Sequence, residues 1–101
     1  MNISANELPE PVAVDVTVSA DALTVSLSDG RAISAPLAWY PRLAHGKPAE
    51  RRRWQLIGKG QGIHWPDLDE DISVAALLRG RRSKESTASL KRWLGTRSRG
   101  S

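Results

Sequence analysis

The chain has 101 residues, of which 40% are hydrophobic and none is cysteine, and it carries a net charge of +4. This length predicts one domain with a modest core, and the absence of cysteine excludes disulfides and thiolate metal sites. No apolar run approaches the roughly 18 residues of a membrane span, and the first ten residues lack the basic and apolar regions of a signal peptide. We therefore expect a cytoplasmic protein that makes no membrane contact.

Charge is distributed unevenly along the chain. Residues 1–78 carry seven Lys and Arg against ten Asp and Glu, a net charge of −3, whereas residues 79–101 carry eight against one, a net charge of +7. This split predicts a boundary at Gly80, between a small domain over residues 1–80 and a basic C-terminal tail over residues 81–101.

The N-terminal third has the pattern of an antiparallel β-meander. Valines at every second position over residues 12–18 predict a strand with the valines on its buried face. Apolar residues at positions 23, 25 and 27 predict a second strand, and Asp29-Gly30 directly after it is typical of a hairpin turn. A third, short strand is predicted over residues 31–35, with its isoleucine facing inward.

Short helices are predicted to follow the meander. Residues 37–44 have helical spacing with a break at Pro41, and Pro48 with Glu50 in the first turn predicts a second short helix. The chain on either side of the later glycines is predicted to be extended.

The C-terminal third is predicted to be helical. Ser73 is typical of a residue that caps a helix, and Gly80 is typical of one that ends it. A further helix is predicted over roughly residues 86–94, ending at Gly95. Together these elements predict an α+β fold in which an N-terminal antiparallel β-meander packs with short helices.

Three glycines at alternate positions, 58, 60 and 62, form the least ordinary stretch of the chain. Their spacing matches neither the dinucleotide-binding fingerprint nor the phosphate-binding loop, and no helix is predicted directly after them. We therefore interpret them as a structural bend.

His64 and the acidic residues 67–71 consist of side-chain types that bind metals. They lack the paired histidines of a zinc helix and the spaced oxygens of a calcium loop. We favour a histidine bonded within a turn and acids that cap the following helix, with a metal-dependent or acid–base site as the alternative. Because no nucleophile motif is present, we expect no enzyme activity, no metal and no cofactor.

The aromatic residues of the middle block are predicted to form a Trp-rich core, with one or two exposed as interface anchors in the alternative interpretation. The candidate partner-binding residues are Trp39, Tyr40, Arg42, Arg51, Trp54, His64 and Trp65.

The basic tail is expected to attract polyanions, and its tryptophan could stack on a base. The alternative is that the tail only keeps the protein soluble and binds no nucleic acid. The candidate nucleic-acid-binding residues are Arg79, Arg81, Arg82, Lys84, Lys91, Arg92 and Trp93.

A resemblance to a known family is carried by two longer segments, Pro36-Leu-x-Trp-Tyr-Pro-Arg-Leu43 and Ile57-Gly-x-Gly-x-Gly-Ile-His-Trp-Pro-x-Leu-Asp-Glu-Asp-Ile-Ser73. Shorter matches lie at Asp29-Gly-Arg31, Ile33, Glu50-Arg51, Trp54 and Leu77-Leu78-x-Gly80. With these segments, roughly residues 12–80 resemble the bacterial and phage family called domain of unknown function 2442. The resemblance implies a small α+β domain without established catalytic residues. Some similar proteins are encoded in what look like toxin–antitoxin pairs, and some continue into a helix-turn-helix, for which residues 81–101 are too short.

We therefore expect a small non-catalytic binding protein, the antitoxin-like partner of another small protein encoded nearby in a bacterial or phage operon. The alternative is an accessory or regulatory protein that binds DNA or RNA through its basic tail.

Overall fold

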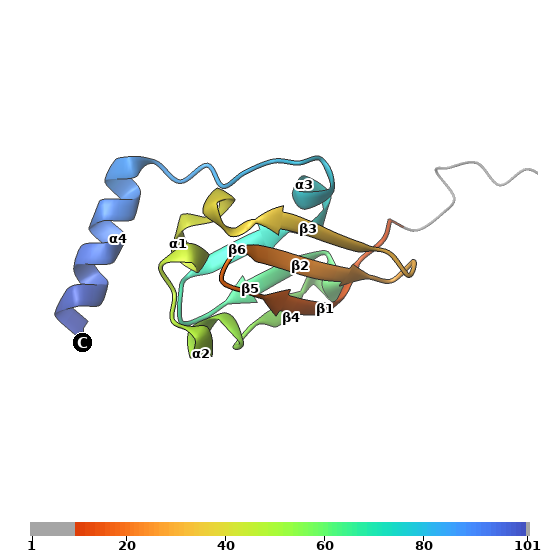
Figure 1. Cartoon of the computed structure of the whole chain (residues 1–101), viewed down its shortest axis with the longest axis horizontal. Coiled ribbons are helices and arrows are strands. Elements are labelled where there is room, and N and C mark those ends of the chain that lie inside the picture. Colours follow the sequence, from red (N-terminus) through yellow and green to blue (C-terminus); the bar gives the residue numbers. More distant parts are fainter. Residues whose placement is uncertain (1–9, 101) are drawn as a thin grey trace, which may run out of the picture.

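Two three-stranded antiparallel sheets, joined by short helices, make up the body of the chain (Figure 1). The computed structural model describes residues 10–100, and residues 98–100 by their backbone alone. The first sheet has the strand order β1-β2-β3, and the second has the order β4-β5-β6. The predicted α+β fold with an N-terminal meander is confirmed. The strands are β1 Ala13–Val18, β2 Ala22–Leu27, β3 Ala32–Pro36, β4 Gln55–Ile57, β5 Gly62–Trp65 and β6 Glu70–Ser73.

The alternation in β1 is interrupted, which corrects one prediction. Val16 is buried as expected, but Val14 is 54% exposed and the neighbouring Ala13 is buried instead. The pairing of β1 with β2 shifts register between Ala13 and Asp15. A bulge of this kind places one extra residue in the strand and reverses the alternation beyond it. β2 keeps the predicted pattern throughout.

The turn between β2 and β3 forms at the predicted dipeptide. Gly30 has a φ of +91°, a conformation that glycine adopts without steric penalty. The Arg31 amide donates to the Asp29 carboxylate at 3.1 Å. The side chain of Asp29 therefore stabilises the hairpin locally.

In the described part of the chain, three short α-helices connect or follow the sheets. α1 (Pro41–Ala44) and α2 (Pro48–Arg51) both begin at the predicted prolines. α3 (Val74–Leu78) is capped by the Ser73 hydroxyl, which accepts from the Ala76 amide at 3.3 Å. Gly80, with a φ of +71°, follows Arg79, the residue that ends this helix.

The glycine stretch forms the turn between β4 and β5, as the structural interpretation predicts. Gly60 has a φ of +88°, and a Cβ built there would lie 2.7 Å from the Ala13 carbonyl oxygen. Any side chain at position 60 would therefore collide with the backbone of β1. This close approach fixes the hairpin of the second sheet against the first.

The acidic residues before α3 do not cap it, so that prediction is wrong. Glu70 and Asp71 belong to β6, and the first turn of α3 contains no acid. Glu70 pairs with Trp65, and Asp71 pairs with His64. Because successive strand residues point to opposite faces, Glu70 faces the core and Asp71 faces outward.

The inner faces of both sheets contribute to one core. Leu23 and Val25 from β2 and Ile63 and Trp65 from β5 are each 0% exposed. The Trp65 indole donates to the Arg51 carbonyl at 3.1 Å, which satisfies its one buried donor.

The final helix, α4 (Thr87–Gly100), is longer than predicted. It continues through Gly95, where a Cβ would meet open space, so this glycine does not end it. α4 stands at one end of the body, reached by an extended segment after α3 (Figure 1). Among the described residues, no helix is long and apolar enough to cross a membrane.

Candidate functional site

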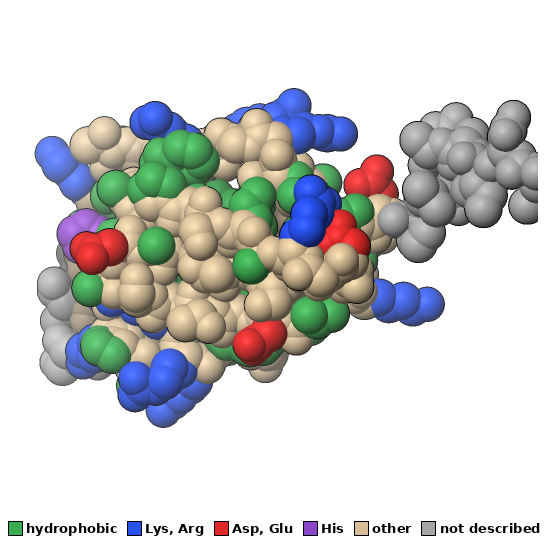
Figure 2. All heavy atoms as spheres, turned by 45° about the vertical axis from the view of Figure 1, so that its right-hand side comes forward, with side chains coloured by type: hydrophobic (Ala, Val, Ile, Leu, Met, Phe, Trp, Pro, Cys, Tyr) green, Lys and Arg blue, Asp and Glu red, His purple; other side chains and the backbone are tan. Residues whose placement is uncertain are grey.

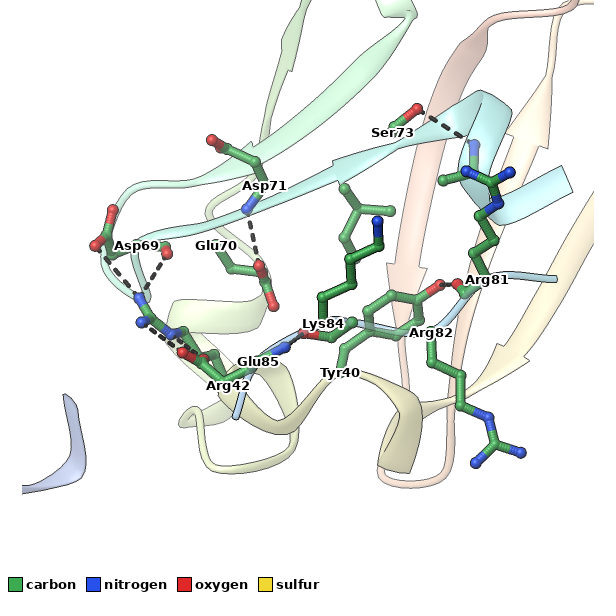
Figure 3. Close-up of a pocket in the computed structure, with 13 residues that line it drawn as sticks. Tyr40, Arg42, Asp69, Glu70, Asp71, Ser73, Arg81, Arg82, Lys84 and Glu85 are labelled. Carbon is green, nitrogen blue, oxygen red and sulfur yellow. Dashed lines mark hydrogen bonds and ion pairs between the residues drawn. The ribbon is translucent and has the colours of Figure 1, made fainter. Parts of the chain in front are cut away.

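A hollow of about 510 Å³ lies between β6 and the extended segment that follows α3 (Figure 3). We call it the β6 hollow. Its charged and polar lining comes from Tyr40 and Arg42 at the start of α1, from residues 69–73 in and just before β6, and from residues 81–85. These lining residues include Tyr40, Arg42, Glu70, Ser73, Lys84 and Glu85.

Arg42 holds the C-terminal segment at one side of the β6 hollow. Its guanidinium donates to both oxygens of Glu85, from Nη2 at 2.9 Å and from Nε. It also donates to the Asp69 carbonyl at 2.9 Å. The side chains of Arg42 and Glu85 are only 16% and 10% exposed. Hydrogen bonding from Arg42 lowers the pKa of Glu85, so this pair is charged at neutral pH.

Glu70 is the most perturbed acid of the β6 hollow. One of its oxygens accepts from the Asp71 amide at 3.0 Å, and the other is buried without a hydrogen-bond partner. Burial raises the pKa of Glu70 to about 7, with the nearby Arg42 opposing the shift. The hollow therefore contains one carboxyl group that changes its charge near neutrality.

His64 is bonded across strands and not within a turn. Its Nδ1 contacts the carboxylate of Asp71 on the outer face of the second sheet. The two side chains are 31% and 67% exposed. Within residues 10–97, no group of three His, Asp or Glu is placed to hold a metal ion.

The predicted partner-binding aromatics are divided between core and surface. Trp65 and Tyr40 are 0% and 4% exposed, so they belong to the core and do not form a partner surface. Trp39 and Trp54 are half-buried, so each packs partly against the core and keeps part of its ring exposed. The Arg82 guanidinium covers Trp39, with 5.0 Å between its central carbon and the ring centroid.

A second hollow of about 590 Å³ runs along β1. We call it the β1 groove. One wall is residues 15–20, and the other consists of Pro48, Arg51, Arg52 and Trp54. The Arg51 guanidinium donates to the carbonyls of Leu43 and Ala44 at 2.8 and 2.7 Å. The groove thus brings together Arg51 and Trp54 from the predicted partner-binding set.

The predicted nucleic-acid-binding residues separate into two groups. The six basic side chains, from Arg79 to Arg92, are exposed. Trp93 is half-buried between two guanidinium groups, with Arg42 and Arg97 at 5.1 and 4.7 Å from its ring centroid. Arg97 also donates to both oxygens of Glu50 at 2.7 and 3.2 Å. Trp93 therefore docks α4 on the body and does not present a free ring for stacking.

Basic side chains do not form one continuous patch on the face shown in Figure 2. Lys and Arg side chains lie in separate groups along its upper and lower margins and on its right-hand side, where some adjoin acidic side chains, and the surface between the groups is mostly neutral. A polyanion on this face would contact separate basic groups.

A family model described as "Protein of unknown function (DUF2442)" matches residues 13–83. The chain belongs to this family. The match confirms the resemblance found in the sequence, and it extends from β1 to the start of the segment that leads to α4. None of the curated proteins matches the chain.

Two solved structures are similar to this DUF2442 chain. A protein of unknown function from Rhodospirillum rubrum is 25% identical, with a TM-score of 0.65 and coverage of 81% of this chain and 99% of that one. An uncharacterised protein from Chromobacterium violaceum, solved by NMR, is 20% identical, with a TM-score of 0.62 and coverage of 80% and 74%. The second likeness is evidence of fold alone.

Several residues that organise the surface of this DUF2442 chain are missing from the predicted set. Glu85 and Glu50 hold the C-terminal segment, Arg97 pairs with Glu50, and Arg52 lines the β1 groove. Glu85 has a signal in the sequence, because it is the single acid among the basic residues of the tail. The others depend on contacts between distant segments.

Proposed function

We propose that this DUF2442 protein is a cytoplasmic, non-catalytic binding protein, the antitoxin-like partner of another small protein encoded beside it. The observation that carries the proposal is the β1 groove, in which half-buried Trp54 stands beside Arg51 and exposed Arg52. Tryptophan and arginine are the residue types that most often dominate binding energy in protein interfaces.

Trp54 has the features of an interface anchor. It packs partly against the core, so its ring is held in place before binding and loses little conformational freedom. Among the described residues, neither Arg51 nor Arg52 forms an ion pair, so both keep their charge for a partner. These properties favour a protein ligand with acidic groups.

Co-expression with the neighbouring short reading frame, followed by pull-down and calorimetry, tests the proposal. Trp54→Ala is expected to weaken binding by at least about 2 kcal/mol, or about 30-fold, with the circular dichroism spectrum unchanged. Trp39→Ala is the matched control, because Trp39 is also half-buried but lies outside the β1 groove. A neighbour that never co-purifies with the wild-type chain would end the antitoxin-like interpretation.

Binding of DNA or RNA through the tail is the second candidate, favoured by the six exposed basic side chains of residues 79–92. Release of counterions makes such binding fall by orders of magnitude between about 50 and 200 mM salt. Fluorescence anisotropy with the full chain tests it. The double variant Lys91→Glu, Arg92→Glu should abolish binding, whereas Lys59→Glu, far from the tail in sequence, should change it little. Equal loss in the two variants would contradict a role for the tail.

A further inference from the structure

β1 has a free hydrogen-bonding edge. It is the outer strand of the first sheet and pairs only with β2. The Ser19 amide donates to the Ala22 carbonyl at 2.9 Å, so these two residues form a hydrogen-bonded pair. This pair determines which residues of β1 direct their backbone groups toward β2. Backbone groups alternate in direction along an antiparallel strand. Thr17 therefore bonds toward β2, and the backbone N–H and C=O of Val16 and Val18 point away from it.

The hydrogen bonds of β2 support the same assignment of which β1 residues face the free edge. The Leu27 amide donates to the Arg31 carbonyl at 2.8 Å, on the β3 side. Thr24, three residues earlier, therefore directs its backbone groups toward its β1 partner Thr17. Within the described part of the chain, no turn or loop bonds to the backbone of Val16 or Val18.

The β1 groove runs along this free edge. The strand part of this wall is residues 15–18 of β1, roughly 13 Å long at about 3.3 Å per residue, and the groove continues along Ser19 and Ala20 of the turn. The opposite wall, formed by Pro48, Arg51, Arg52 and Trp54, lies beside this edge.

The charge of the β1 groove favours an acidic ligand. Its charged lining residues are two basic ones, Arg51 and Arg52, and one acidic one, Asp15. Arg52 is exposed. The carbonyls of Leu43 and Ala44 fix the Arg51 guanidinium in position. A carboxylate entering the groove would therefore meet a net positive charge.

We propose that the β1 groove binds an extended acidic segment of a protein partner, which adds to the first sheet as a strand beside β1. The ligand backbone bonds to Val16 and Val18, every second side chain faces Trp54, and its carboxylates meet Arg52. Strand addition of this kind takes affinity from main-chain bonds and specificity from alternate side chains. The proposal rests on the proposed function and specifies the kind of partner.

An acetylated eight-residue peptide of alternating valine and glutamate is the probe, and alternating valine and lysine is its control. Titration into ¹⁵N-labelled full-length protein should shift the amides of residues 15–20 and the Trp54 indole, with at least tenfold tighter binding of the glutamate peptide. No shift in β1 up to millimolar peptide, or equal binding of the lysine peptide, would overturn the proposal.

Substitutions separate the backbone contribution from the charge contribution. Val18→Pro removes the amide that faces the free edge, and Val18→Ala keeps it, so only the proline variant should lose tenfold or more in affinity. Arg52→Glu should lose as much, and Lys59→Glu, which lies outside the β1 groove, should not. If Val18→Pro does not fold, the comparison of Arg52→Glu with Lys59→Glu still tests the proposal. Equal affinity of these two variants for the glutamate peptide would overturn it.

The two proposals fail in different ways. If the neighbouring protein co-purifies equally well with Val18→Pro and Arg52→Glu, the groove proposal is wrong and the proposed function stands. If the glutamate peptide binds at β1 but no neighbouring protein co-purifies, the groove stands and the antitoxin-like function is wrong.

Discussion

The body of the chain and its C-terminal segment are held by different forces. The body has a core in which both sheets bury large apolar side chains such as Leu23, Ile63 and Trp65. Residues 81–97 are attached by two ion pairs, Arg42 with Glu85 and Arg97 with Glu50, by hydrogen bonds with Tyr40 and Trp39, and by one half-buried tryptophan. Burial of apolar surface is insensitive to moderate salt, whereas charge pairs are screened by it.

This difference means that the segment should detach before the body unfolds. Both ion pairs are partly exposed, so each contributes on the order of 1 kcal/mol and not the larger values of buried pairs. Local opening with a free energy below that of global unfolding is the expected behaviour of such a segment.

The largest expected effect comes from the body. Gly60→Ala places a Cβ 2.7 Å from the Ala13 carbonyl oxygen at a φ of +88°, and we expect a loss of at least about 2 kcal/mol in the free energy of unfolding. Gly30→Ala is the matched control, because Gly30 has a φ of +91° in open space and shows the conformational cost alone. Urea denaturation measures both, and equal losses would contradict the close contact between the sheets.

The attachment of the segment is tested next. Arg42→Gln removes the guanidinium from Glu85, Asp69 and Trp93 at once, and we expect a loss of about 1–2 kcal/mol. Hydrogen exchange should show α4 losing its protection while β2 and β5 keep theirs. Arg53→Gln, which removes an exposed ion pair with Asp67, should cost less than about 0.5 kcal/mol. Unchanged protection of α4 in Arg42→Gln would show that charge does not hold the segment.

The pH dependence of stability should have opposite signs for two acids near Arg42. The pKa of Glu70 is raised to about 7 by burial, so the folded state binds more protons and stability falls as the pH rises from about 4.5 to 7. After allowance for partial solvent access we expect about 1–2 kcal/mol, and Glu70→Gln should remove this fall. A fall of equal size in the variant would contradict the assignment to Glu70.

Glu85 gives the contrasting case. Because Arg42 lowers the pKa of Glu85, its contribution to stability is present above the ordinary pKa of glutamate and is lost as the pH falls below it. Thermal melting of Glu85→Gln should therefore match the wild type in acid and differ from it at neutral pH.

The smallest expected effect lies in α4 itself. Gly95 sits inside the helix with open space around it, so Gly95→Ala should stabilise the helix by about 0.5–1 kcal/mol. The exchange of α4 amides should slow, and the urea midpoint of the body should not move. A shift of that midpoint would mean that α4 and the body unfold as one unit.

Features with a local cause were predictable from the sequence. Asp29 bonds the amide two residues later, Ser73 caps the turn that follows it, and Pro48 starts a helix with its fixed φ. Each of these features depends on neighbours within about four residues, so the amino-acid sequence alone was sufficient to predict them.

Features that need distant segments were not predictable. The inward position of Glu70 depends on its pairing with Trp65 in a second sheet, and a short apolar run does not reveal its strand partner. The reversal at Val14 depends on a bulge against β2. The β1 groove exists because α2 lies beside an edge strand, and the role of Trp93 depends on Arg42, fifty-one positions earlier.

The short connection between α3 and α4 sets an effective concentration. It lies along the body, where the Ser83 amide donates to the Trp39 carbonyl at 3.0 Å and the Tyr40 hydroxyl donates to the Arg81 carbonyl at 3.3 Å. Contacts of about 4 kcal/mol in total correspond to a dissociation constant of about 1 mM for a separate peptide. A short tether supplies a local concentration in the millimolar range, comparable with this dissociation constant, so the tethered helix is docked for a large share of the time, whereas a separate peptide at micromolar concentration would be almost entirely unbound. Proteolytic cleavage of one peptide bond between residues 81 and 86 would therefore release α4 by dilution.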